Sequence, residues 1–123
     1  MASITRIDFI PLPTQDAARA TAFYRDTLGL QEAERTVGKP HTEFDLGGTT
    51  LNVWDPSSAG REFQANTNAV ALHTDDVAAM RTQLEAEGVA FFGPTIDTGV
   101  CHMALFADPD GNPLMLHGRY APH

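Results

Sequence analysis

Apolar and polar positions follow the same order of patterns twice along the chain. The first half reads as a strand, a helix and three extended segments, at residues 4–12, about 16–28, 32–37, 41–46 and 49–54. The second half repeats that order, at residues 69–73, about 76–87, 89–92, 100–106 and 113–117. Gly29 and Gly88, which end the two helices, lie 88 − 29 = 59 positions apart. The pattern therefore predicts two copies of one supersecondary unit.

The predicted helices have recognisable ends. Thr14 is a plausible N-cap for the first helix, and Thr74 or Asp75 for the second, because their side-chain oxygens can accept from free backbone N–H groups. Gly29 and Gly88 supply the left-handed conformation that commonly ends a helix. Each helix carries an apolar stripe, so each is expected to cover one sheet face.

A two-residue turn is predicted at Gly47-Gly48, between two alternating segments. This turn fixes the hairpin register, since a two-residue loop pairs the residues that flank it. The expected cross-strand pairs are Leu46 with Thr49, Glu43 with Asn52, and His41 with Trp54.

The stretch 55–68 is polar and rich in turn-forming residues, which is typical of a linker. We therefore expect one domain over residues 1–123. Its first module covers about 4–57, its linker about 58–67, and its second module about 68–118. A chain of 123 residues is long enough to bury a core.

The composition excludes several classes of partner. A formal net charge of −8 argues against nucleic acid or an anionic membrane surface, because both repel an acidic protein. The single cysteine, Cys101, excludes an intrachain disulfide and fits a reducing compartment. The start of the chain lacks the apolar run of a signal peptide, so a cytoplasmic location is expected.

Four segments together resemble the vicinal oxygen chelate superfamily, which includes glyoxalase I, extradiol dioxygenases and bleomycin-binding proteins. They are ATAFYRDTLGL (20–30), LGGTTLNVWDP (46–56), DDVAAMRTQLEAEGV (75–89) and FADPDGNPLML (106–116). The resemblance spans essentially the whole chain. It implies an α+β fold of two tandem βαβββ modules that form a cupped eight-stranded half-barrel, commonly completed by a homodimer.

The resemblance also implies where a metal would be held. Metal enzymes of this family use four inward-facing His or Glu side chains, and the matching positions here are Phe9, Asn52, Ala69 and Met115. None offers a carboxylate, an imidazole or a thiolate, which are the usual ligands of divalent transition metals. The sequence therefore predicts no metal and no cofactor at this site.

The residues that would line the cavity follow from strand alternation. For residues 100–106 the resemblance favours Met103 facing inward and His102 outward, and a one-residue slip of the register would reverse both. The predicted ligand-binding residues are Phe9, His41, Asn52, Trp54, Ala69, His73, Met103, Met115 and His117.

Several of these residues have more than one interpretation. Trp54 either stacks a planar ligand or packs the hairpin. Glu43, in a semi-apolar cup, is a candidate general base or an anchor for a ligand amine; at an open sheet edge it is an ordinary wet carboxylate. His41, His73 and His117 are polar cavity groups or, less simply, a displaced metal site.

Three functions remain open from the sequence. The first is a metal-free protein that binds a small organic molecule in an apolar cup, as antibiotic-sequestering members of the family do. The second is a metal-independent lyase or isomerase with Glu43 as base and His41 or Asn52 polarising a carbonyl. The third is a glyoxalase- or dioxygenase-like metal enzyme with rearranged ligands.

Overall fold

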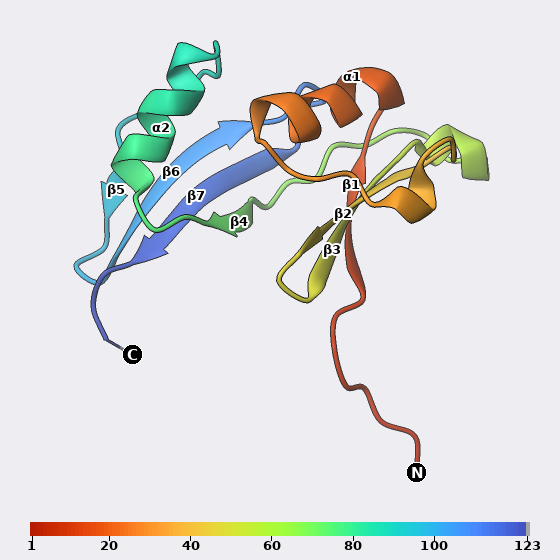
Figure 1. Cartoon of the computed structure of the whole chain (residues 1–123), viewed down its shortest axis with the longest axis horizontal. Coiled ribbons are helices and arrows are strands. Elements are labelled where there is room, and N and C mark those ends of the chain that lie inside the picture. The colour runs from red at the N-terminus through yellow and green to blue at the C-terminus, as the bar shows by residue number, and fades with distance from the viewer. Residues whose placement is uncertain (123) are drawn as a thin grey trace. The chain divides into compact units, whose positions relative to one another are not determined.

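The first half of the chain forms a three-stranded sheet with one helical segment across a single face. In the computed structural model, which describes residues 1–122, the strands are β1 (Phe9–Pro13), β2 (Thr42–Leu46) and β3 (Thr49–Trp54), in the order β1-β3-β2. Helix α1 (Ala17–Ala22) continues into a π-helical turn, η1 (Phe23–Thr27), and lies along the sheet in Figure 1. The core of this half consists of Leu12, Ala20, Tyr24, Phe44, Leu51 and Val53.

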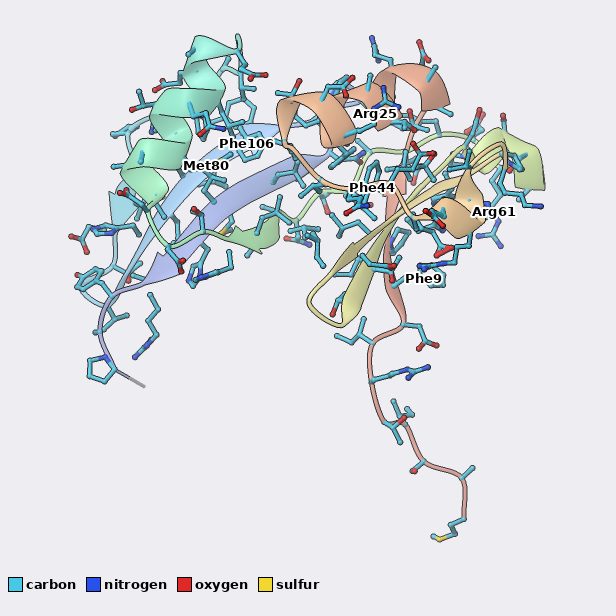
Figure 2. The ribbon with its side chains drawn as sticks, in the orientation of Figure 1. Phe9, Arg25, Phe44, Arg61, Met80 and Phe106 are labelled. Carbon is cyan, nitrogen blue, oxygen red and sulfur yellow. The ribbon has the colours of Figure 1, made fainter. Side chains whose placement is uncertain are left out.

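The second half repeats the arrangement with four strands. These are β4 (Val70–His73), β5 (Ile96–Asp97), β6 (Cys101–Ala107) and β7 (Pro113–Arg119), in the order β4-β7-β6-β5, with α2 (Val77–Ala86) as the helix. Figure 2 shows Phe44 near α1 and Phe106 near α2, each on the helix side of its sheet. The core here consists of Val77, Leu84, Ala104, Phe106, Leu114 and Leu116.

The chain divides into two compact units, Met1–Ala65 and the part from Asn66 onward. Each unit begins with a strand that pairs in parallel with the last strand of the same unit, β1 with β3 and β4 with β7. The predicted α+β class is therefore confirmed, and the units repeat one order of pairing. Residues 1–122 contain seven strands. Where the first unit would have its fourth strand, it has only an isolated bridge between Glu32 and Phe44.

The first strand is shorter than predicted. Phe9 pairs with Thr50, so only Thr49, the first residue of β3, remains beyond the pairing with β1. Residues 1–8 are therefore outside the sheet and exposed, and Figure 1 shows them extending away from it. The alternating pattern of residues 4–12 does not show where the partner strand, β3, begins.

The N-caps of both helices also differ from the prediction. Asp16 caps α1 and Asp76 caps α2, each through a side-chain oxygen that accepts from a backbone N–H three residues on. Thr14 is instead buried before the helix, where its hydroxyl accepts from the N–H of Asp16. The aspartate is the better cap because its charge also favours the positive end of the helix dipole.

The hairpin register is as predicted. Leu46 pairs with Thr49 and Glu43 with Asn52 across Gly47-Gly48. The third expected pair, His41 with Trp54, is not part of the ladder, because β2 begins at Thr42. Both glycines have positive φ, 52° and 94°, which a two-residue turn of this kind requires.

Two segments that were expected to be extended, 32–37 and 89–92, differ in the structure. Residues 32–37 hold a 3-10 helix, η2 (Glu34–Thr36), after the single bridge at Glu32. In the second unit, 89–92 makes only the bridge from Phe91 to Phe106, and the edge strand is β5 instead. Short edge segments carry too few alternating positions to be located by pattern alone.

Candidate functional site

The face of the first sheet that points away from α1 carries Glu43, Asn52 and Trp54, three of the residues predicted to act. Because side chains alternate along a strand, the residues opposite the core share this face. The register places them in cross-strand rows: Phe9, Thr50 and Asp45 in one row, and Pro11, Asn52 and Glu43 in the next. Trp54 follows Asn52 by two residues and so projects to the same side.

A pocket of about 260 Å³ opens where β3 ends. It is lined by Pro40, His41, Asn52, Trp54, Asp55 and Ser58. Ser58 reaches it because the chain turns directly after Trp54 into a 3-10 helix, η3 (Pro56–Ala59), which Asp55 caps by accepting from the N–H of Ser57 at 2.9 Å. The volume is slightly below the range of about 300–1,000 Å³ that is typical of small-molecule sites.

Asn52 is unusual among the pocket residues. Its Oδ1 is fully buried and accepts no hydrogen bond from any residue between 1 and 122. A buried carbonyl oxygen without a donor is destabilising, and such atoms are rare in folded proteins. Asn52 thus lines the pocket with part of its side chain, while its Oδ1 is inaccessible and makes no hydrogen bond within the described chain.

Glu43 does not stand alone in an apolar wall. Arg35, on η2, donates to both Glu43 oxygens at 3.3 Å and to both oxygens of Asp45 at 2.6 and 2.8 Å. The Glu43 side chain is 21% exposed, so it is shielded mainly by this guanidinium and the strands beside it. The negative charge of Glu43 is therefore largely offset by the guanidinium of Arg35.

The Arg35 cluster is strongly ionised. Hydrogen bonds from Arg35, and then from Thr50, lower the pKa of Asp45 to about 2. The same contacts with Asp45 and Glu43 raise the pKa of Arg35. His41 is close by, with Nε2 3.7 Å from a Glu43 oxygen, and its side chain is 41% exposed at the mouth of the pocket.

Phe9 lies on the same face but is not part of the pocket. It is the first residue of β1 and is 53% exposed, beside the N-terminal segment (Figure 2). The structure thus brings His41, Asn52 and Trp54 together and leaves Phe9 one row away.

The remaining predicted residues belong to the second unit. Met103 pairs with His117 and Leu105 with Met115, so these residues share the sheet face opposite the core residues of β6 and β7. His73 pairs with His117 across the parallel strands, and its Nε2 lies 3.0 Å from Asp75. Ala69 directly precedes β4. His102 projects to the other side, where it approaches Asp97 at 3.4 Å.

The donor atoms present do not fit the divalent metal of the related enzymes. Phe9, Asn52, Ala69 and Met115 offer one amide and one thioether between them. No group of three His, Cys, Asp or Glu side chains converges anywhere in residues 1–122. We therefore derive no metal chemistry for this site.

Sequence reasoning missed four residues that shape the site. Arg35 was placed in an extended segment, and no pattern indicated that a 3-10 helix would aim it at Glu43. Asp55 and Ser58 were read as linker, although Asp55 followed by Pro56 is a typical helix start and could have located η3. Pro40 carried no recognisable pattern.

Comparison with known proteins gives the same fold. An antibiotic binding protein, TnmS3, from Streptomyces sp. CB03234 has a TM-score of 0.78 at 27% identity, over 97% of this chain and 99% of its own. A lactoylglutathione lyase from Agrobacterium tumefaciens has a TM-score of 0.77 at 22% identity, over 94% of each chain. A glyoxalase/bleomycin resistance protein/dioxygenase from Nocardioides has 0.75 at 21%, over 100% and 92%.

No functionally curated protein matches the sequence. Within residues 1–122, no helix is long and apolar enough to cross a membrane. The family model that matches, over residues 6–116, is that of the glyoxalases, bleomycin resistance proteins and dioxygenases. The chain belongs to the Glyoxalase/Bleomycin resistance protein/Dioxygenase superfamily.

Proposed function

We propose that the protein binds a planar organic molecule at the Trp54 pocket without a metal ion and sequesters it. The observation that carries this proposal is the pocket itself, where an indole, an imidazole and an unpaired amide meet. These groups suit stacking and hydrogen bonding. The residues at the family's metal positions lack the side chains that usually coordinate a metal ion. The antibiotic binding protein TnmS3, at 27% identity, supports the same assignment.

The electrostatics favour a ligand that is neutral or cationic. The chain carries a formal net charge of −8, and the carboxylate-bearing residue Asp55 lines the pocket. We further propose that the protein acts in the cytoplasm, as a single domain of two modules, and that it forms a homodimer. The homodimer follows from the resemblance to related proteins, and size-exclusion chromatography with light scattering measures it.

Titration with 9-aminoacridine, a planar cation, tests the binding function. Trp54 is the sole tryptophan, so its fluorescence reports directly on the pocket. We expect saturable quenching in the wild type, and isothermal titration calorimetry should give a dissociation constant that Trp54→Ala raises at least tenfold, because an aromatic contact is removed. Phe92→Ala, which removes an exposed aromatic residue in the second unit, is the control and should bind normally. Absence of heat and quenching up to millimolar probe would contradict the proposal.

A further inference from the structure

We propose that Asp55 selects ligands in which a protonated amine lies at the edge of a flat ring. This inference rests on the proposed binding function and adds the chemical class of the ligand, an aryl-substituted ammonium ion. Its starting point is the position of Asp55, which lines the pocket and directly follows Trp54 in the chain.

The orientation of the Asp55 side chain is fixed by contacts within the chain. Its Oδ1 accepts from the backbone N–H of Ser57 at 2.9 Å, which makes Asp55 the N-cap of η3. The Asp55 carbonyl accepts from the backbone N–H of Ser58 at 3.0 Å and from the Ser58 hydroxyl at 2.7 Å. A group that is already held in place loses little conformational freedom on binding, so Asp55 is suited to anchor a ligand.

The carboxylate of Asp55 is not neutralised by the chain itself. Within residues 1–122 it makes no ion pair with an arginine, lysine or histidine, and its Oδ2 accepts no hydrogen bond. By contrast, the charge of Glu43 is offset by Arg35, and the same guanidinium also binds Asp45. The six residues that line the pocket include no arginine or lysine. Because Asp55 is half-buried, its attraction for a cationic ligand is stronger than it would be in bulk water.

The spacing of Trp54 and Asp55 indicates where the ligand carries its charge. Consecutive Cα atoms lie about 3.8 Å apart, so a ring stacked on the indole has an edge close to the carboxylate. A positive nitrogen bonded to that ring directly or through one methylene group would come within reach of Oδ2, to which an ammonium group donates. A neutral ring of the same shape keeps the stacking contact and loses this charge-assisted hydrogen bond.

The charge of Asp55 can be removed while the cap is kept, because asparagine caps helices as well as aspartate does. Asp55→Asn therefore separates a ligand anchor from a residue that only starts η3. Asp76→Asn is the matched control, since Asp76 caps α2 in the same way, by accepting from the N–H of Ala79 at 3.0 Å, and does not line the pocket. Both variants change the net charge of the chain by the same amount.

Two probes of nearly equal shape test the inference by isothermal titration calorimetry at neutral pH and constant ionic strength. 1-Naphthylmethylamine is a cation under these conditions, and 1-naphthalenemethanol is a neutral counterpart that keeps a hydrogen-bond donor. We expect the wild type to bind the amine about tenfold more tightly than the alcohol, because a hydrogen bond between charged groups is stronger than a neutral one. In Asp55→Asn the ratio of the two dissociation constants should fall to about one, and in Asp76→Asn it should stay at about ten.

Each outcome separates the inference from the function on which it rests. A ratio near one in the wild type, a preference that persists in Asp55→Asn, or a preference that is lost in Asp76→Asn overturns the role of Asp55, while binding of 9-aminoacridine leaves the proposed function intact. Failure of 9-aminoacridine and both naphthalene probes to bind overturns both. Should Asp55→Asn not fold, as judged by circular dichroism, Asp55→Ser provides the same test, because serine also caps helices and carries no charge.

Discussion

Replacing Asn52 with leucine removes a buried carbonyl oxygen that has no donor in the described part of the chain. Leaving such an atom unsatisfied costs about 1–3 kcal/mol of stability, and an apolar side chain of similar size carries no such penalty. We therefore expect the free energy of unfolding of the ligand-free protein to rise by about 1–2 kcal/mol. For a chain of this length the corresponding increase in Tm is about 4–8 °C.

The same substitution at Asn112 is the matched contrast. Asn112 is fully buried, donates to Asp108 at 2.8 Å through Nδ2, and accepts from the N–H of Asn66 at 2.9 Å through Oδ1. Leucine there leaves a buried carboxylate and a backbone N–H without these partners, so we expect a loss of about 2–4 kcal/mol.

Urea denaturation followed by circular dichroism measures both changes, with free energies taken by linear extrapolation at constant slope. The two Asn→Leu variants should move in opposite directions from the wild type. A destabilised Asn52→Leu protein would refute the reasoning, since it would mean that the Asn52 amide already makes a stabilising contact in the free protein.

Three further predictions follow from named contacts. Glu43→Gln should leave the affinity for 9-aminoacridine within about threefold, because Arg35 keeps the side chain in place. Should the wild type show isomerase or lyase activity, complete loss of that activity in Glu43→Gln would instead favour Glu43 as a general base. Because the folded pKa of Asp45 is about 2, below its ordinary value, its ion pair stabilises the fold above about pH 4 and the contribution disappears as the pH falls through 2. The stability difference between wild type and Arg35→Gln should therefore be constant at neutral pH and vanish near pH 2 in urea titrations; a difference that grows on acidification would contradict this. Gly118→Ala should lower the free energy of unfolding by about 1–3 kcal/mol, because a Cβ there would lie 2.8 Å from the backbone oxygen of Thr74, and an unchanged urea midpoint would show that β7 can shift.

The internal repeat and the central hairpin could be predicted because each depends on local chemistry. Gly47-Gly48 specifies a two-residue turn, and that turn alone sets Glu43 opposite Asn52. Alternation then places Trp54 on the same face as Asn52. These inferences needed no knowledge of the rest of the chain.

What could not be predicted depends on partners distant in sequence. The start of β1 at Phe9 depends on where β3 begins, and the position of Arg35 depends on a 3-10 helix that hydrophobic patterning does not reveal. The unpaired state of Asn52 is of the same kind, since it follows from Pro11 and Glu43 being its neighbours. Sequence patterning thus found the face that carries the site, and only the register showed which of its groups lacks a partner.

Nuclear magnetic resonance of ¹⁵N-labelled protein titrated with 9-aminoacridine tests the location of binding most directly, because Trp54 supplies the only indole N–H signal. The account predicts that this signal and the side-chain amide signals of Asn52, assigned by comparison with Asn52→Leu, shift together and saturate at one equivalent of ligand per chain. Saturable binding with both signals unmoved would place the ligand elsewhere and contradict the account.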